Sequence, residues 1–412
     1  MSDYTTNGKG RNPMVKKLQP KLRFRGFTDA WELRRLKSLH RQPLLVSPVP
    51  SQTYISWSVP AFSTGEPEIV KGSEIESVKQ SVNSSDVLLC RINPRINRVW
   101  VVEARKDTDL PMIASTEWVV FTGHNSDSYF LSALFTSSRF RNMLLSEVAG
   151  VTGSQKRFQI ASVLERQEYF PTQIEQARIG LLFEKVDNLI AAEKRKLLLL
   201  EQKREAYSQK VFSYGSHHEE DVKHWKTMRL GDIATRITRR NKGQSNLPLT
   251  ISARDGLIDQ RQFFSKQVAS KNLDNYILLQ RGEFAYNKST SSDSPWGTIK
   301  RLDRYDQGCI STLYICFSMH SVDPQFITTL FNSPIWHREI QTIATEGARN
   351  HGLLNISPKD FFDIQLQIPD SLSEQKHIGR FFAAYEQLIR QTAKRIGLLE
   401  KKKKALLQTM FI

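Results

Sequence analysis

The sequence predicts an α+β protein made of two copies of one unit, each a mixed α/β domain followed by a long helix. Residues 175–212 align without a gap to residues 374–411 at an offset of 199, and 14 of the 38 positions are identical. Both segments lack proline and repeat apolar residues at spacings of three and four, as amphipathic helices do. The regions before them mix strand-like and helical patterns without regular alternation, which favours α+β over a doubly wound sheet.

The predicted order along the chain has five parts. A basic N-terminal tail at 1–24 and a mixed domain at 25–173 precede a helix at 174–216, and a second mixed domain at 217–373 precedes a C-terminal helix at 374–412. Weaker matches extend the repeat into the domains, such as Trp31 with Trp225. A long internal repeat of this kind predicts a pseudo-two-fold molecule.

Runs rich in β-branched and aromatic residues predict strands in both domains. They lie at 86–92, 98–103 and 117–121 in the first domain, and at 276–279 and 310–317 in the second. Helical periodicity covers 129–148 and 324–344, and polar runs at 239–246 and 291–297 predict loops.

The two long helices carry an apolar a/d seam over four heptads, which predicts that they pair as an antiparallel coiled coil. Polar residues interrupt the seam at matching places, Glu193/Thr392 and Arg204/Lys403, and such residues usually fix the register. The predicted seam residues are Phe183, Val186, Ile190, Leu197, Leu200, Phe382, Tyr385, Ile389, Ile396 and Leu399. Plain dimerisation or core packing is the alternative interpretation of this pattern.

A formal net charge of +17 suggests a polyanionic partner such as nucleic acid. Most of the excess charge lies in 1–23 and 374–412, so the nearly neutral mixed domains would need segregated basic faces to bind DNA. Three scattered cysteines, no apolar run long enough to span a bilayer and a polar N-terminus favour a cytoplasmic protein without membrane association.

Catalytic and metal-binding motifs are absent from the sequence. It has no P-loop, no dinucleotide fingerprint and no HExxH motif, so we expect no catalytic residue, no metal site and no cofactor bound by this chain. Asp370, Glu374 and Lys376 resemble a nuclease set only loosely. Glu374 and Lys376 belong to the repeated helix start, where an acidic residue fits the helix dipole.

Loops that mix basic, amide and aromatic residues occur at matched places in both domains. Arg, Asn and Gln read purine edges, whereas Lys and Ser anchor phosphates. The candidate DNA-binding residues are Arg91, Asn93, Arg95, Asn97, Arg98, Lys156 and Arg157 in the first domain, and Arg239, Arg240, Tyr286, Asn287, Lys288, Ser289, Arg349 and His351 in the second. For any single residue an ordinary solvated loop is the alternative, and the matched occurrence favours binding.

The repeated arrangement resembles the DNA-specificity (S) subunit of type I restriction-modification enzymes. The resemblance rests on PKLRFRGFTDAWELRRLKSL (20–39) and on the helix starts FPTQIEQARIG and IPDSLSEQKHIG. It departs from the family in its basic tail, which has no counterpart in the second half.

The resemblance implies two target recognition domains, each reading one half of a bipartite site in double-stranded DNA. It also implies paired helices that set the spacer and dock two methyltransferase (M) subunits, which restriction (R) subunits join. S-adenosylmethionine, ATP and Mg²⁺ would then bind partner subunits. Two alternatives remain open from the residues: a coiled-coil scaffold without DNA contact, and a stand-alone nuclease.

Overall fold

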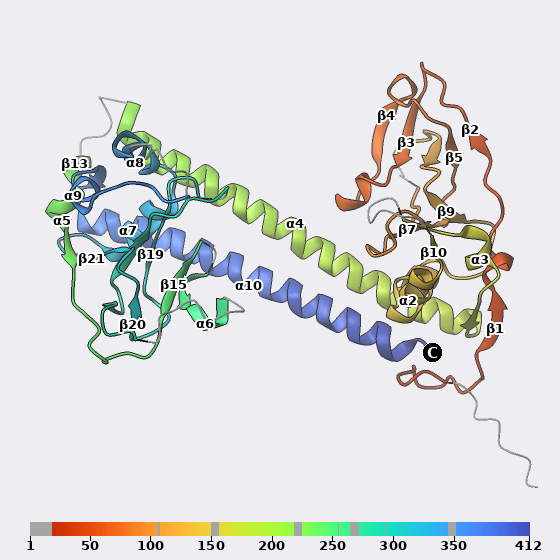
Figure 1. The fold of residues 1–412 in the computed structure, drawn as a ribbon. Helices are drawn as coiled ribbons and strands as arrows, with labels where there is room; N and C mark the ends of the chain where they lie inside the picture. The colour runs from red at the N-terminus through yellow and green to blue at the C-terminus, as the bar shows by residue number, and fades with distance from the viewer. Residues whose placement is uncertain are drawn as a thin grey trace, which may run out of the picture. The chain divides into compact units, whose positions relative to one another are not determined.

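A computed structural model of the protein describes residues 19–104, 108–149, 156–217, 225–253, 255–263, 272–292, 294–344 and 352–412. The chain divides into two compact units (Figure 1). Unit 1 contains residues 1–195 and 393–412, and unit 2 contains residues 196–392. Each unit therefore combines one mixed domain with a part of each long helix, and the predicted α+β class is confirmed.

Unit 1 is built on three groups of paired strands. Strand β1 (Glu32–Arg35) pairs antiparallel with β12 (Gln167–Phe170), directly before the long helix α4 (Gln173–His217). An antiparallel sheet of order β7-β6-β9 comes from Val99–Val101, Val87–Cys90 and Trp118–Phe121. A second sheet, of order β2-β5-β8-β3-β4, comes from Leu45–Val46, Lys79–Ser81, Met112–Ala114, Thr53–Trp57 and Glu68–Lys71, and its β3–β8 pair is parallel.

Short helices complete unit 1. They are α1 (Ser128–Thr136), α2 (Ser138–Ser146), α3 (Ile160–Leu164) and the 3-10 helices η1 (Leu36–Leu39), η2 (Ala61–Ser63) and η3 (Gly72–Glu74). A small hairpin pairs β10 (Val148–Ala149) with β11 (Arg157–Phe158).

Unit 2 repeats the same frame with different additions. Strand β13 (Trp225–Arg229) pairs with β22 (Gln365–Pro369), before helix α10 (Leu372–Met410). The main sheet, of order β14-β21-β18-β19, comes from Ala234–Ile237, Ile315–Met319, Phe284–Asn287 and Thr298–Arg301. Two hairpins pair β15 (Leu249–Ser252) with β16 (Gly256–Asp259) and β17 (Ile277–Gln280) with β20 (Gln307–Ile310). The helices are α5 (Leu230–Ile233), α6 (Gln260–Phe263), α7 (Pro324–Asn332), α8 (His337–Ile343) and α9 (Pro358–Phe362).

Three predicted elements are divided in the structure. The run 310–317 is not one strand, because a turn separates the end of β20 from β21. The helical pattern at 129–148 forms α1 and α2, because the Ser137 hydroxyl accepts a hydrogen bond from the Phe140 amide and caps a new helix. The pattern at 324–344 likewise forms α7 and α8.

An aromatic cluster joins the long helices to the domain core in each unit. In unit 1, Phe411 packs against Trp31, Phe130 and Phe183 with ring centroids 5.8 to 6.3 Å apart. In unit 2, Phe212 packs in the same way against Trp225, Phe326 and Phe382, at 6.1 to 6.3 Å. In each cluster, a ring near the start of one long helix (Phe183 or Phe382) meets a ring at the end of the other (Phe411 or Phe212). The packing therefore confirms the internal repeat.

The repeated helix start, Glu-Gln-x-x-Ile-Gly, has a structural role in unit 1. The buried Gln176 amide donates to the Pro171 carbonyl (2.9 Å) and accepts from the Asp127 amide (3.3 Å). Asp127 in turn caps α1 through the Phe130 amide (2.8 Å). Gly180 lies against this cap, where a Cβ atom would come within 2.0 Å of the Asp127 Oδ1. The motif therefore fixes the long helix to the domain.

Gln375 makes the same contacts in unit 2. Its amide donates to the Pro369 carbonyl (2.8 Å) and accepts from the Asp323 amide (2.8 Å), and Asp323 caps α7. Glu175 and Glu374, which precede the glutamines, differ in partner. Glu175 is fully buried and forms a two-pronged ion pair with Arg23, both distances 2.7 Å, whereas Glu374 accepts from the Trp225 indole (2.9 Å).

The long helices pair antiparallel within each unit, as predicted. In unit 1, Asp187 pairs with Lys403 and the later residue Glu193 pairs with the earlier Arg395 (3.0 Å). In unit 2, the order is the same. Arg204 pairs with Glu386 (2.9 Å), and the Tyr207 ring packs on Phe381 and Tyr385.

The seam residues lie on the inner side of these pairs. Among the ten, Phe183, Ile190, Phe382 and Ile396 are buried, and Val186, Leu197, Leu200, Tyr385, Ile389 and Leu399 are half-buried. Ion pairs explain two of the polar interruptions of the seam. Arg204 pairs with Glu386 and Lys403 pairs with Asp187, and these two carboxylates occupy equivalent positions of the repeat.

Candidate nucleic-acid interface

In unit 1, two loops that are distant in the sequence lie side by side. The Asn93 amide donates to the Lys156 carbonyl (2.8 Å), and the Phe158 amide donates to the Arg91 carbonyl (3.3 Å). Asn93 adopts a left-handed backbone with φ of 47°, which asparagine tolerates better than most residues. The candidate residues of 91–98 and of 156–157 therefore form one surface.

Unit 2 brings the equivalent segments together by the same backbone bonds. The Thr290 amide donates to the Gly352 carbonyl (2.8 Å), and the Leu354 amide donates to the Lys288 carbonyl (3.0 Å). These donors and acceptors match those of unit 1 at offsets of 196 to 197. Each unit thus presents one paired-loop surface, defined as 91–98 with 156–158 in unit 1 and 287–290 with 352–354 in unit 2.

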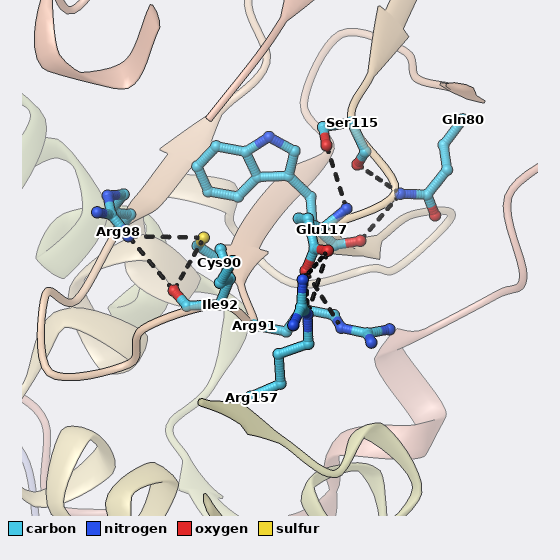
Figure 2. Close-up of polar contacts among 9 residues, drawn as sticks. Gln80, Cys90, Arg91, Ile92, Arg98, Ser115, Glu117 and Arg157 are labelled. Carbon is cyan, nitrogen blue, oxygen red and sulfur yellow. Dashed lines mark hydrogen bonds and ion pairs between the residues drawn. The ribbon is translucent and has the colours of Figure 1, made fainter. Parts of the chain in front are cut away.

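A carboxylate organises two of the candidate arginines in unit 1 (Figure 2). Glu117 lies in the turn between β8 and β9, and it accepts from Arg157 Nη2 (2.8 Å) and Nε (3.0 Å). The Arg91 Nε lies 3.5 Å from the same carboxylate. The hydrogen bond from Arg157 is the largest cause that lowers the pKa of Glu117, so the cluster is charged at neutral pH. All three side chains are about one-third exposed and reach solvent.

Two other cations border a surface hollow of about 320 Å³ on the paired-loop surface of unit 1. Asn93, Pro94, Arg95, Leu145, Val148 and Lys156 line it. Within the described part of the chain, the side chains of Arg95 and Lys156 have no hydrogen bond or ion pair.

The remaining candidates in unit 1 hold the loop itself. The Asn97 amide donates to the Phe135 carbonyl (2.8 Å), and Arg98 donates to the Ile92 carbonyl (3.3 Å). These bonds fix the conformation of the loop that carries Arg91 and Arg95.

The candidates in unit 2 are spread more widely. Arg239 pairs with Glu283 (2.8 Å) and Arg240 donates to the Asn275 carbonyl, so both lie near β17. On the paired-loop surface, Lys288 donates to the Ile356 carbonyl (3.3 Å), and the Asn287 side chain accepts from the Ser289 amide (3.0 Å).

The expectation for Tyr286 is corrected by the structure. This residue is fully buried, its ring stacks on Phe361 at 4.7 Å and its hydroxyl donates to the Trp296 carbonyl (2.9 Å). It supports the sheet and has no exposed surface with which to contact DNA. Arg349 and His351 lie outside the described residues.

Sequence reasoning missed Glu117. The sequence offered little reason to select Glu117, because an acidic residue is not expected among residues that bind a polyanion. Across the described ranges, no cluster of His, Cys, Asp and Glu is arranged to hold a metal ion. None of the helices described is both long and apolar enough to cross a membrane.

The fold matches solved structures. No protein-family model matches the sequence, and no curated protein sequence does either. The S subunit of the type I restriction-modification system from M. genitalium superimposes with a TM-score of 0.61 at 14% identity, over 96% of this chain and 99% of that one. This chain has the fold of a type I S subunit.

Two further solved structures match at lower scores. One, from work on complex assembly and conformational transition of the type I R-M system, has a TM-score of 0.48 at 18% identity over 92% of this chain and 97% of that chain. The HsdS subunit from Thermoanaerobacter tengcongensis has a TM-score of 0.40 at 17% identity over 92% and 96%.

Proposed function

We propose that this chain is the DNA-specificity subunit of a type I restriction-modification complex. The observation that carries the proposal is the paired-loop surface, which occurs once in each unit with matching backbone hydrogen bonds. Two equivalent surfaces with different side chains suit two readers of two different half-sites. The S-subunit fold supports the same function.

In this proposal, each unit reads one half of a bipartite site in double-stranded DNA. Lys156 and Arg95 contact phosphates, which sets the register, while arginine and asparagine side chains of the paired-loop surfaces contact base edges. The nearly neutral units bind DNA through these local cations, and the excess charge elsewhere adds a sequence-independent attraction.

We also propose that the chain itself is not an enzyme. Methyltransferase subunits, two in number, dock on the long helices, and restriction subunits join them. S-adenosylmethionine, ATP and Mg²⁺ bind those partners, and the complex works in the cytoplasm.

The test is the methylation pattern of cells that carry this chain with its methyltransferase partner. A bipartite methylated motif that disappears when this chain is deleted supports the proposal. An Arg91→Ala variant should change base preference in only one half of that motif, and relaxation of both halves would contradict the two-reader model. An unchanged pattern after deletion favours a scaffold without DNA contact. DNA cleavage by the purified chain with Mg²⁺ alone favours a nuclease.

A further inference from the structure

We infer that Glu117 is a positioning and specificity-determining residue of the first DNA reader, and this inference rests on the proposed function. It holds Arg91 and Arg157 in a fixed orientation toward a defined base pair. It also reduces the attraction of these two arginines for phosphates elsewhere on DNA.

The turn that carries Glu117 is anchored from the interior. The buried Gln80 amide donates to the carbonyls of Ser115 and Trp118, both at 2.9 Å (Figure 2). The Ser115 hydroxyl accepts from the Glu117 amide (3.2 Å), and the Glu117 carbonyl accepts from the Arg91 amide (2.9 Å). The carboxylate is therefore placed by the fold before any ligand arrives, as a preorganised recognition group should be.

The contacts of Glu117 restrict the guanidinium group of Arg157 and attract that of Arg91, which makes an ion pair without a hydrogen bond. Arg157 uses both Nε and Nη2 on the carboxylate, a geometry that fixes the plane of the group. Arg91 approaches the same carboxylate at 3.5 Å. An arginine with a fixed plane discriminates bases better than a mobile one, because bidentate contact with guanine needs one orientation.

The charge balance gives the second effect. One carboxylate between two guanidinium groups leaves a net charge of +1 instead of +2, so the cluster displaces fewer counterions from a random duplex. The three side chains are about one-third exposed, so the cluster can be reached by a ligand from solvent.

Unit 2 has no carboxylate at the equivalent place. Continuing the β18–β21 register by two residues places Leu313 opposite Lys288, where unit 1 has Glu117 opposite Arg91. Leu353 takes the place of Arg157. Any effect of Glu117 on specificity should therefore be confined to one half of the DNA site.

The experiment uses the full chain with its methyltransferase partner and a pool of duplexes of randomised sequence. We expect Glu117→Gln to lose base preference in one half-site and keep the other. On a random duplex, the slope of log K against log salt should become steeper by about 1, because the one positive charge that is released adds about 0.9 when it contacts a phosphate.

Two further variants make the result specific. Glu165→Gln removes the same charge from unit 1, and Glu165 also pairs with two cations, Arg35 (3.4 Å) and Lys37 (3.2 Å). This control should change neither the base preference in the half-sites nor the salt slope. Glu117→Asp keeps the charge but moves the carboxylate, so it should alter base preference while the salt slope stays as in the parent protein.

The inference is overturned if Glu117→Gln retains base preference in both half-sites and has the same salt slope as Glu165→Gln. A parent complex that selects no sequence from the pool would instead overturn the proposed function, so the two failures are distinguishable.

Discussion

The glycine of the repeated helix start provides the sharpest test of how each long helix is fixed to its domain. We predict that Gly180→Ala destabilises the protein although alanine is the better helix former. The new Cβ would lie 2.0 Å from the Asp127 Oδ1 and 2.9 Å from the Phe130 amide nitrogen. The Asp127 carboxylate must then move, and its capping bond to that amide is lost.

The magnitude follows from three contributions. Alanine gains about 1 kcal/mol over glycine inside a helix. Overpacking costs about 1–3 kcal/mol, and loss of the cap costs about 0.5–2 kcal/mol. The net loss is about 0.5–4 kcal/mol. For a cooperative unit of this size, each kcal/mol shifts Tm by about 2–4 °C, so we expect Tm to fall by about 1–16 °C.

Scanning calorimetry of the full chain measures this change, with Gly397→Ala as the control. A Cβ at Gly397, in the same long-helix system, meets no atom within 4 Å, so this variant should raise Tm slightly. Gly379→Ala should behave like Gly180→Ala, because its Cβ would lie 2.8 Å from the Phe326 amide nitrogen. If Gly180→Ala unfolds at or above the temperature of Gly397→Ala, the close contact does not restrain the helix.

Three further predictions concern charged groups. Arg204→Glu and Glu386→Arg should each lower the free energy of unfolding by about 1 kcal/mol or less, because the ion pair is partly exposed. In urea unfolding, the double variant should recover most of this loss. A double variant no more stable than the single variants would refute the pairing. Burial raises the pKa of Glu168 above its ordinary value of 4.5, so this group favours the folded state below pH 4.5 and loses that contribution as the pH rises. Glu168→Gln should therefore be more stable than the parent at pH 7, with the difference closing near pH 4, and equal stabilities at pH 7 would contradict the effect of burial. Arg95→Ala and Lys156→Ala should each reduce the salt slope of DNA binding by about 1, whereas a slope that stays constant in both would exclude them as phosphate contacts.

The sequence was sufficient to predict the frame because the frame repeats. The offset of 199 aligned the helix starts, and the structure explains the shared Gln and Gly by one contact scheme with Asp127 in unit 1 and Asp323 in unit 2. The heptad pattern likewise predicted the antiparallel pairs. These features depend on local periodicity and on residues that have the same neighbours in both copies.

The paired-loop surfaces were harder to predict because each depends on distant segments. The hydrogen bond between Asn93 and Lys156 joins residues that no local pattern relates. Tyr286 was misassigned because its polar neighbours suggest a loop, whereas β18 is buried on both faces and the Tyr286 ring lies in the same core as Phe284. The sheet β2-β5-β8-β3-β4 also escaped prediction, since its strands are short and one pair is parallel.

The proposed function requires one repeated frame to carry two specificities, and the different roles of backbone and side chains allow this. The bonds that join the paired loops run between main-chain atoms in both units, so the same pairing can carry different side chains at the positions of Glu117 and Arg157. Glu117 and Arg157 in unit 1 can therefore stand where unit 2 has Leu313 and Leu353, without loss of the frame. The buried aromatic clusters, by contrast, use side chains and keep the same residue types in both copies. Changes on the paired-loop surface should consequently alter what is bound before they alter whether the chain folds.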